Sequence, residues 1–477
     1  MVKCSVSIGR LGGRAHLLAP RFQFIKEVIM VETSPDVKRL AKLCIDSSTI
    51  DPQLYSDYHV YRGLRAPDGS GVRTGLTEVA DVKVNEIVDG QYRACPGVLS
   101  YRGYNVKDIV ADVLSSKRFG FEEVIYLLLF GDMPGDEETE NFKELIGSYR
   151  QLPTSFFRDI IMKSPSMDIM NSMARSVLTL YSYDPEAEDM SFENVLQQCL
   201  WLIATFPQLA VYSYQAYKYY KSDSNSFFIH DPIPTLSTAE NILHMLRIDS
   251  NYTDLEARVL DLALILHAEH GGGNNSTFTT RLVSSTGTDT YSAIAAALGS
   301  LKGPKHGGAN IKVCRMFENI KDNVKDWADE NEIRAYLTKI LDKKAFDNSG
   351  LIYGLGHAIY QVSDPRAEVF KSSVERLSKE KGMEAEFNLY ESVEKIGAEL
   401  LTERRKTDKG VCANVDFYSG FCYQMLGLPS ELFTPMFAVA RIAGWSAHRL
   451  EELLSSGGKI MRPAYLYVGQ YRDYKKK

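Results

Sequence analysis

Apolar residues recur at spacings of three and four along most of the chain, and this pattern predicts an all-α protein. The helical period covers residues 34–44, 105–114, 120–130, 137–149, 156–163, 169–181, 192–220, 237–246, 254–269, 291–301, 311–328, 330–343, 366–381, 384–404, 416–426 and 432–451. By window length we expect about twenty helices. The best short-strand signal is 98–101, after a predicted turn at Pro96-Gly97.

The distribution of charge predicts two helical domains. The densely charged segments 321–344 and 366–405 contrast with the apolar segments 192–310 and 410–450. We therefore expect a large domain, residues 31–308 and 421–477, and a smaller inserted domain, residues 309–420, with the active-site cleft between them. Glycines in 303–308 suggest a hinge there.

The first thirty residues form a separate case, because they are basic and contain no acid before Glu27. We expect residues 1–30 to be a disordered extension, or to precede a natural start at Met30. The composition also resembles a targeting peptide, which is the less favoured interpretation.

Bulk composition excludes several classes of function. The 477 residues carry a net charge of -6 and no long basic run, which argues against nucleic acid as the main partner. Seven cysteines without a CxxC pair predict free thiols in a reducing compartment, so we expect a cytoplasmic protein. The most apolar stretch, 195–217, is interrupted by glutamines and Pro207, and we expect a buried helix broken near Pro207, with no membrane span.

Two glycine-rich breaks, GGGNN and GPKHGGAN, each have a histidine beside them. His267 and His270 precede the first break. We expect no metal there, because Glu269 lies between them on another face and the HExxH order is missing. Satisfied core histidines are the alternative, and His270 is the better ligand-binding candidate. His306 precedes the next helix, whose dipole would favour a neutral imidazole able to donate to a developing enolate oxygen, unless it is an ordinary turn histidine.

Four further polar residues stand in glycine-rich or apolar surroundings. His357 follows Gly-Leu-Gly, but GxGxxG is missing and no dinucleotide fold is predicted. Asp416, among Val, Phe and Tyr, is either the N-cap of the helix that follows or a carboxylate kept dry enough to act as a base. Arg441 and Arg462 interrupt apolar stretches and require a carboxylate or phosphate ligand, or a structural salt bridge.

Taken together, HAEH-GGGNN, GPKHGGAN, GLGHAIYQVSDPR, NVDFYSG and MRPAYLYVG resemble the citrate synthase family in order and spacing, over roughly residues 60–470. The resemblance implies a homodimeric, cytoplasmic, almost wholly helical transferase of the tricarboxylic acid cycle. It also implies Claisen-type condensation of acetyl-CoA with oxaloacetate, followed by hydrolysis of citryl-CoA to citrate and CoA. The acyl group becomes an alkyl group on transfer. Acetyl-CoA is then a co-substrate, and no cofactor is bound permanently.

The resemblance assigns roles residue by residue. His306, His357 and Asp416 match the catalytic residues, with Asp416 as the base. His270, Arg366 and Arg441 match oxaloacetate ligands, and Arg462 matches the arginine that reaches the neighbouring subunit's site. The coenzyme A ligands would be Leu351, Ile352, Tyr353, Gly354, Leu355, Gly356 and Asn414.

The chain also departs from the family's pattern. Ala358 and Gln361 stand where many relatives carry basic residues, and Phe417-Tyr418 differs from the Ala-His of animal forms and looks like a bacterial subtype. The acyl group therefore stays open, and 2-methylcitrate synthase, acting on propionyl-CoA, is the alternative. A hydrolase or a helical scaffold without activity is the more distant hypothesis, since no GxSxG motif occurs.

Overall fold

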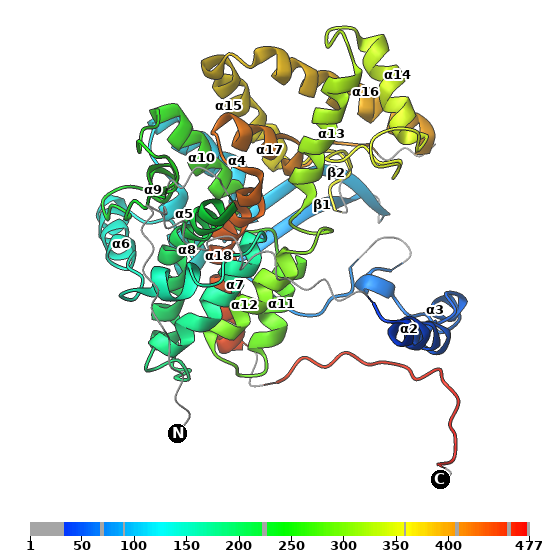
Figure 1. Cartoon of the computed structure of the whole chain (residues 1–477), viewed down its shortest axis with the longest axis horizontal. Helices are drawn as coiled ribbons and strands as arrows, with labels where there is room; N and C mark the ends of the chain where they lie inside the picture. The colour runs from blue at the N-terminus through cyan, green and yellow to red at the C-terminus, as the bar shows by residue number, and fades with distance from the viewer. Residues whose placement is uncertain are drawn as a thin grey trace, which may run out of the picture. The chain divides into compact units, whose positions relative to one another are not determined.

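The protein is all-α, as predicted. The computed structural model describes residues 33–66, 71–88, 91–221, 227–356, 359–405, 410–455 and 459–474. Helices account for 61% and strands for 5% of the chain, and seventeen α-helices are found among the described residues (Figure 1).

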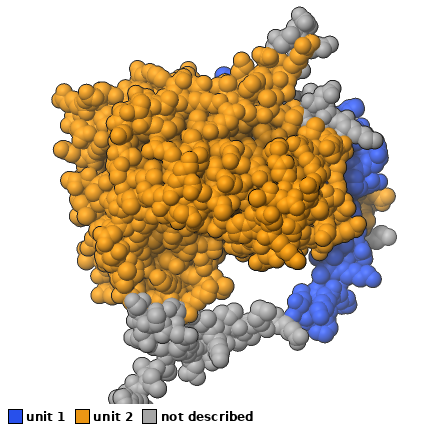
Figure 2. All heavy atoms as spheres, turned by 90° about the horizontal axis from the view of Figure 1, so that it is seen from above, with its two compact units in different colours: residues 1–76 blue, residues 77–477 orange. Residues whose placement is uncertain are grey.

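The chain divides into two compact units, Met1–Leu76 and Thr77–Lys477, which Figure 2 colours separately. The first unit contains α2 (Pro35–Ser48) and α3 (Gln53–Asp57). Ser34 accepts the backbone N–H of Val37 at the start of α2, and Pro35 occupies the first turn, which explains why the helix predicted over 34–44 begins there. The expected extension 1–30 lies outside the described residues.

The second unit holds the other helices. These are α4 (Val106–Ser116), α5 (Phe121–Phe130), α6 (Asp136–Ser148), α7 (Ile169–Leu180), α8 (Phe192–Lys221), α9 (Thr238–Leu246), α10 (Asp254–His267), α11 (Asn275–Ser284), α12 (Thr290–Leu301), α13 (Ala309–Asn323), α14 (Glu330–Leu341), α15 (Pro365–Lys381), α16 (Glu384–Arg405), α17 (Val415–Met425) and α18 (Phe433–Ser455). Residues 156–163, predicted as a helix, contain a short π-helix, Phe157–Ile161.

A small antiparallel sheet precedes these helices, with strands β1 (Ala80–Val88), β2 (Gln91–Tyr101) and β3 (Tyr104–Asn105) in that order. The predicted turn at Pro96-Gly97 is wrong, because both residues lie inside β2. They fall in the irregularity between the Asn85–Ala94 and Lys83–Val98 pairs. A strand tolerates proline at such a point because its missing N–H breaks no regular ladder bond.

The helix predicted to break near Pro207 does not break. α8 runs through Pro207, which is itself buried. By length and composition α8 is also long and apolar enough to cross a membrane, but 83% of its most apolar window is buried inside the protein. A proline inside a helix costs about 3 kcal/mol, and burial of the surrounding apolar residues offsets that loss.

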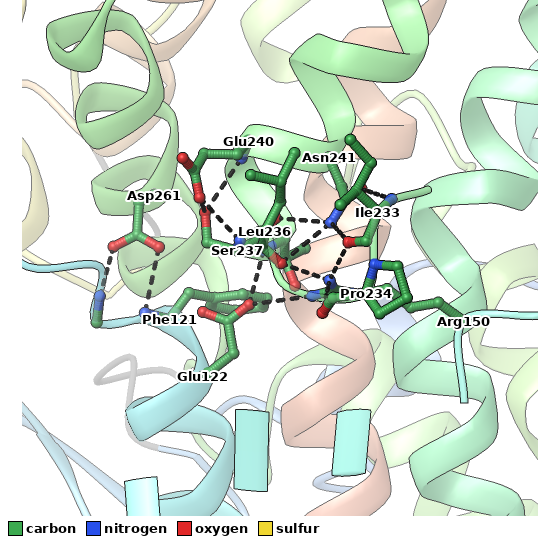
Figure 3. Close-up of polar contacts among 12 residues, drawn as sticks. Phe121, Glu122, Arg150, Ile233, Pro234, Leu236, Ser237, Glu240, Asn241 and Asp261 are labelled. Atoms are coloured by element: carbon green, nitrogen blue, oxygen red, sulfur yellow. Dashed lines mark hydrogen bonds and ion pairs between the residues drawn. The ribbon is translucent and has the colours of Figure 1, made fainter. Parts of the chain in front are cut away.

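The core contains α10 and α18, both with almost fully buried central residues. Buried polar groups fix the surrounding helix ends (Figure 3). Asp261 of α10 accepts the backbone N–H groups of Gly120 and Phe121 at 2.8 and 3.3 Å, which caps α5. Glu122 accepts the N–H of Thr238 at 2.7 Å, at the start of α9. These bonds position α5 and α9 against α10.

Helices α13 to α17 lie near one another in Figure 1, and they carry much of the charge noted in the sequence. The contacts join residues 77–477 into one unit. The division into a large and a small domain, with a hinge at 303–308, stays a prediction.

Candidate active site

Arg441 lies in the middle of α18 and is fully buried. Its Nε donates to the His267 carbonyl at 2.9 Å, and its guanidinium carbon lies 4.8 Å from the centre of the Phe437 ring. Nη1 and Nη2 are buried and have no hydrogen-bond partner among the residues that the structure describes. A buried donor without an acceptor is costly, so this guanidinium is suited to bind a carboxylate from outside the chain.

Asp416 does not cap its helix, which removes the structural alternative raised for it. Asn414 is the cap: its Oδ1 accepts the backbone N–H of Asp416 at 3.0 Å, and α17 begins at Val415. The Asp416 carboxylate therefore stands in the first turn. Burial raises its pKa to about 6, although the charges of Arg366 and Arg441 act in the opposite direction. A carboxyl group with that pKa is a stronger base than one in water and is still ionised at neutral pH.

His306 lies three residues before α13, and its Nε2 is 3.1 Å from the Ser276 hydroxyl. Burial and, to a smaller extent, the positive charge of Arg441 lower its pKa to about 4. The expected neutral imidazole therefore has burial as its main cause, and the helix dipole is not needed to explain it. A neutral ring at this place can donate one hydrogen bond to a ligand.

A chain of contacts connects His270 with the helix of Asp416. His270 Nε2 lies 3.1 Å from the Tyr360 hydroxyl, and the Tyr360 ring centre lies 5.7 Å from the Arg366 guanidinium carbon. Asp364 accepts Nε and Nη2 of Arg366 at 3.0 and 2.7 Å. It also accepts the backbone N–H of Val415 at 3.3 Å, next to Asp416. One electrostatic neighbourhood thus includes His270, Arg366, Asp416 and Arg441.

His267 is a core residue, as the alternative interpretation held. It is 1% exposed, and its Nδ1 lies 2.8 Å from the Ala263 carbonyl. Burial lowers its pKa to about 3, so it stays neutral inside α10.

The segment 351–356 is fixed to the strand-like residues before α17. Asn414 donates its backbone N–H to the Gly354 carbonyl at 2.9 Å, and Gly356 donates to the Cys412 carbonyl at 2.8 Å. Gly354 has φ +82°, and a Cβ there would lie 2.7 Å from the Phe417 ring. Ile352 and Leu355 are buried, so of the expected coenzyme A ligands in this loop only Leu351 and Tyr353 expose larger side chains.

His357 and Arg462 are the two remaining predicted site residues. His357 lies outside the described residues. Arg462 is exposed in the extended segment 459–474 after α18, and among the described residues no contact connects it with the site.

The sequence did not single out Ser276, Tyr360, Asp364 or Trp445. Ser276 Oγ accepts the indole N–H of Trp445 at 3.1 Å and also lies 3.0 Å from the Asn274 side chain. Tyr360 and Asp364 lie inside the quoted GLGHAIYQVSDPR run and Ser276 directly follows GGGNN, so the sequence did contain a signal for these three residues. For Trp445 the sequence offered one signal, its position one helical turn after Arg441.

The described residues contain no group of three or more His, Cys, Asp or Glu side chains that could hold a metal ion.

The family description "Citrate synthase, C-terminal domain" matches residues 69–464. A citrate synthase of Synechocystis sp. is 34% identical over 386 residues, which cover 79% of this chain and 86% of the relative. A citrate synthase of Acidithiobacillus ferridurans is 35% identical, covering 78% of this chain and 90% of the relative. A 2-methylcitrate synthase of Shewanella oneidensis is 33% identical, covering 78% and 88%.

Solved structures agree with these relatives. Citrate synthase from Pyrobaculum aerophilum superposes with a TM-score of 0.68 at 27% identity, covering 85% of this chain and 93% of that one. Citrate synthase from Thermoplasma acidophilum, in a ternary complex with carboxymethyl coenzyme A and oxaloacetate, gives 0.69 at 26% identity, covering 85% and 96%. The chain belongs to the citrate synthase family, as its sequence motifs predicted, and it is an enzyme of that family.

Proposed function

We propose that this chain condenses acetyl-CoA with oxaloacetate and hydrolyses the resulting citryl-CoA to citrate and CoA. The observation that carries the proposal is Arg441, a dry guanidinium with two unpaired donor nitrogens. Its charge acts on Asp416, a carboxyl group with a raised pKa, and on His306, a neutral histidine. A carboxylate-binding cation, a base and a neutral hydrogen-bond donor are the three groups that this reaction needs.

Asp416 is the base. Its carboxylate takes a proton from the methyl group of acetyl-CoA, and the C–H electron pair becomes the C=C bond of an enol or enolate. The pKa of about 6 suits this step, because the carboxylate is ionised at neutral pH yet more basic than a solvated one.

His306 stabilises the enolate by a hydrogen bond to the thioester oxygen. The hydrogen bonds of the Ser276 hydroxyl determine which ring nitrogen of His306 carries the proton. Trp445 can only donate to the Ser276 hydroxyl, which has a single proton of its own. With Asn274 Oδ1 toward Ser276, that proton goes to the amide oxygen. A half-turn of the Asn274 amide presents Nδ2 instead. We propose this second orientation, in which the hydroxyl donates to His306 Nε2 and the ring proton is on Nδ1, which donates to the thioester oxygen.

Oxaloacetate supplies the ketone that the enol carbon attacks. Arg441 offers Nη1 and Nη2 to one carboxylate. Arg366 is already paired with Asp364 through Nε and Nη2, so Nη1 is the nitrogen outside that pair. His270, with His357 and Arg366, is assigned to the ketone and the remaining carboxylate through the family's motifs. The attack forms the C–C bond, and the ketone oxygen gains a proton to become a hydroxyl.

Hydrolysis completes the reaction. Water adds to the thioester carbonyl of citryl-CoA, the C–S bond breaks, and CoA leaves as the thiol while the acyl carbon becomes a carboxylate. Coenzyme A is held by segment 351–356 and Asn414 in this proposal, with acetyl-CoA as a co-substrate and no permanent cofactor.

A thiol-release assay on the purified full-length chain tests the proposal. We expect free CoA only when acetyl-CoA and oxaloacetate are both present. Release without oxaloacetate would identify a thioester hydrolase, and no release with any acyl-CoA would leave only a binding or structural role.

The second candidate is 2-methylcitrate synthesis from propionyl-CoA, which the Shewanella oneidensis relative favours. One extra methylene changes binding in an apolar pocket by roughly 1–3 kcal/mol. Propionyl-CoA in the same assay decides between the two: a higher kcat/KM than acetyl-CoA would make this the main activity.

We further propose a cytoplasmic homodimer that acts in the tricarboxylic acid cycle, with Arg462 completing the partner's site. Support comes from the exposed, extended segment 459–474, whose Tyr465 and Tyr471 are 94% and 92% exposed. Aromatic side chains left this open on one chain are typical of a segment that packs against another. The described cysteines, Cys44, Cys95, Cys199, Cys314, Cys412 and Cys422, are free thiols, which suits a reducing compartment.

A further inference from the structure

Glu269 and Arg441 are opposite charges, both completely buried, that lie near each other without pairing. Burial alone would raise the pKa of Glu269, yet this pKa lies below its usual value because His448 and Arg441 favour the carboxylate. Among the described residues both terminal nitrogens of Arg441 have no hydrogen-bond partner, and the contact of Glu269 with His448 is close but not aligned as a hydrogen bond. In the part of the chain that the structure describes no ion pair joins the two groups, and Glu269 lies against the His448 ring instead. Something must hold them apart, since a dry carboxylate and a dry guanidinium attract strongly.

The restraint on Glu269 comes from α18 itself. His448 Nε2 lies 3.2 Å from Glu269 Oε1. Glu269 Oε2 occupies the space beside Gly444, where a Cβ would lie only 2.0 Å away. Gly444 and His448 are one and two helical turns beyond Arg441 on the same face of α18, so both contacts place the carboxylate further along the helix than Arg441.

His448 is held in turn by Arg281 of α11, whose Nη1 lies 2.9 Å from His448 Nδ1. A guanidinium has no acceptor, so Nδ1 must be bare and the imidazole proton is on Nε2, facing Glu269. Arg281 is fixed by ion pairs to Glu451 and to Glu452, the latter at 3.1 Å. The His448 ring is therefore held in one orientation, with Nε2 towards Glu269.

We propose that His448 is a positioning residue that holds the Glu269 carboxylate away from Arg441. The two free nitrogens of Arg441 then stay available to a carboxylate of the keto-acid substrate. Without His448, the Glu269 side chain would turn to Arg441 and compete with the substrate for it. This inference rests on the proposed function, in which Arg441 binds oxaloacetate.

The test is a double-mutant cycle on the full-length enzyme. H448L removes the donor at similar volume, and we expect the KM for oxaloacetate to rise at least about tenfold, or ~1.4 kcal/mol. The KM for acetyl-CoA should change much less. Adding E269Q to H448L should restore most of the oxaloacetate KM, because a neutral amide competes weakly for Arg441. H448Q, which can donate to Glu269 and accept from Arg281, should stay close to the wild type.

S446A is the matched control, since Ser446 is buried on the same helix and its hydroxyl has no partner. An unchanged oxaloacetate KM in H448L overturns the proposal. So does a raised KM that E269Q fails to restore, or an equal rise in S446A, because general damage to α18 would then explain the effect. If H448L does not fold, E269Q alone decides: an unchanged or lower KM supports the proposal, and a clear rise overturns it.

Calorimetric binding of oxaloacetate to the same variants separates this inference from the proposed function. If the wild type binds oxaloacetate but releases no CoA, the reaction is wrong and the Kd series still tests His448. If the wild type does not bind oxaloacetate, both proposals fail.

Discussion

At the scale of single residues, Asp416 sets the expected pH dependence. Its pKa is raised to about 6 by burial, so the basic carboxylate is lost as the pH falls through that value. We expect kcat/KM for acetyl-CoA to be level above pH 7 and to fall about tenfold per pH unit well below pH 6. His306, with a pKa of about 4, stays neutral over this window and adds no second step. A pH–rate profile with no break between pH 5 and 7 would contradict Asp416 as the base.

The raised pKa of Asp416 also predicts that D416N loses activity and gains stability. The folded pKa of Asp416 lies above its unfolded value of 3.8, so ionisation weakens the folded state as the pH rises from about 4 to 6. Above pH 6 the cost is about 2–3 kcal/mol, and below pH 4 it is absent. D416N carries no such charge. We expect turnover to fall by about 10²–10⁴, while its Tm relative to the wild type improves with rising pH between pH 4 and 7.

Ser276 and Thr277 offer a matched pair next to each other on α11. Both side chains are buried, but Ser276 contacts His306, whereas the Thr277 hydroxyl has no partner. S276A removes the group that fixes the His306 tautomer. We expect kcat to fall about tenfold to a hundredfold with a smaller change in either KM. T277V should keep kcat near the wild type, and an equal loss in both variants would point to damage of α11.

At the scale of elements, most helices could be predicted because the spacing of apolar residues and the capping residues indicate the same boundaries. Capping boxes at Ser237 and Thr253 are found where α9 and α10 begin, close to the starts of the predicted helices 237–246 and 254–269. α11 was missed because its Ser- and Thr-rich sequence has little apolar period, and packing against α12 and α18 stabilises it instead. The predicted break near Pro207 was wrong for a similar reason, because burial of α8 in the core outweighs the local preference of proline to end a helix.

The loop 351–356 is the element whose geometry should decide coenzyme A binding. Gly354 combines φ +82° with a Cβ position 2.7 Å from Phe417, so G354A forces the loop away from α17. We expect a rise of about tenfold or more in the KM for acetyl-CoA, with the oxaloacetate KM nearly unchanged. Gly382 is the control, because it has φ +66° but open space around its Cβ position. G382A should lower stability by about 1 kcal/mol and leave both KM values alone.

At the scale of the whole molecule, the sequence motifs identified the residues but could not bring them together. His306, Asp416 and Arg441 lie on segments far apart in the chain, and their proximity follows from the packing of α17 and α18 against the core. The protonation state and the hydrogen bonds of each group also depend on the fold. Burial and Arg441 explain the neutral His306, and Asn414 caps α17 in place of Asp416. Isolated motifs carry no information on burial, which is a property of the folded chain.

The last prediction concerns the assembly. If Arg462 serves the partner's site, then R462A and D416N each inactivate both sites of a homodimer, but for different reasons. A hybrid of one R462A chain and one D416N chain keeps one intact site, built from Asp416 of the first and Arg462 of the second. Co-expression with two different affinity tags, followed by tandem purification, isolates this hybrid.

The hybrid should recover about half of the wild-type kcat, whereas each variant homodimer stays nearly inactive. Complementation requires that the two residues act across the interface. If Arg462 served its own chain's site, the R462A chain would lack the arginine and the D416N chain would lack the base. Every site in the hybrid would then be defective. A hybrid as inactive as its parents, with intact dimers by light scattering, would therefore place Arg462 outside the partner's site and leave oxaloacetate binding to residues of a single chain.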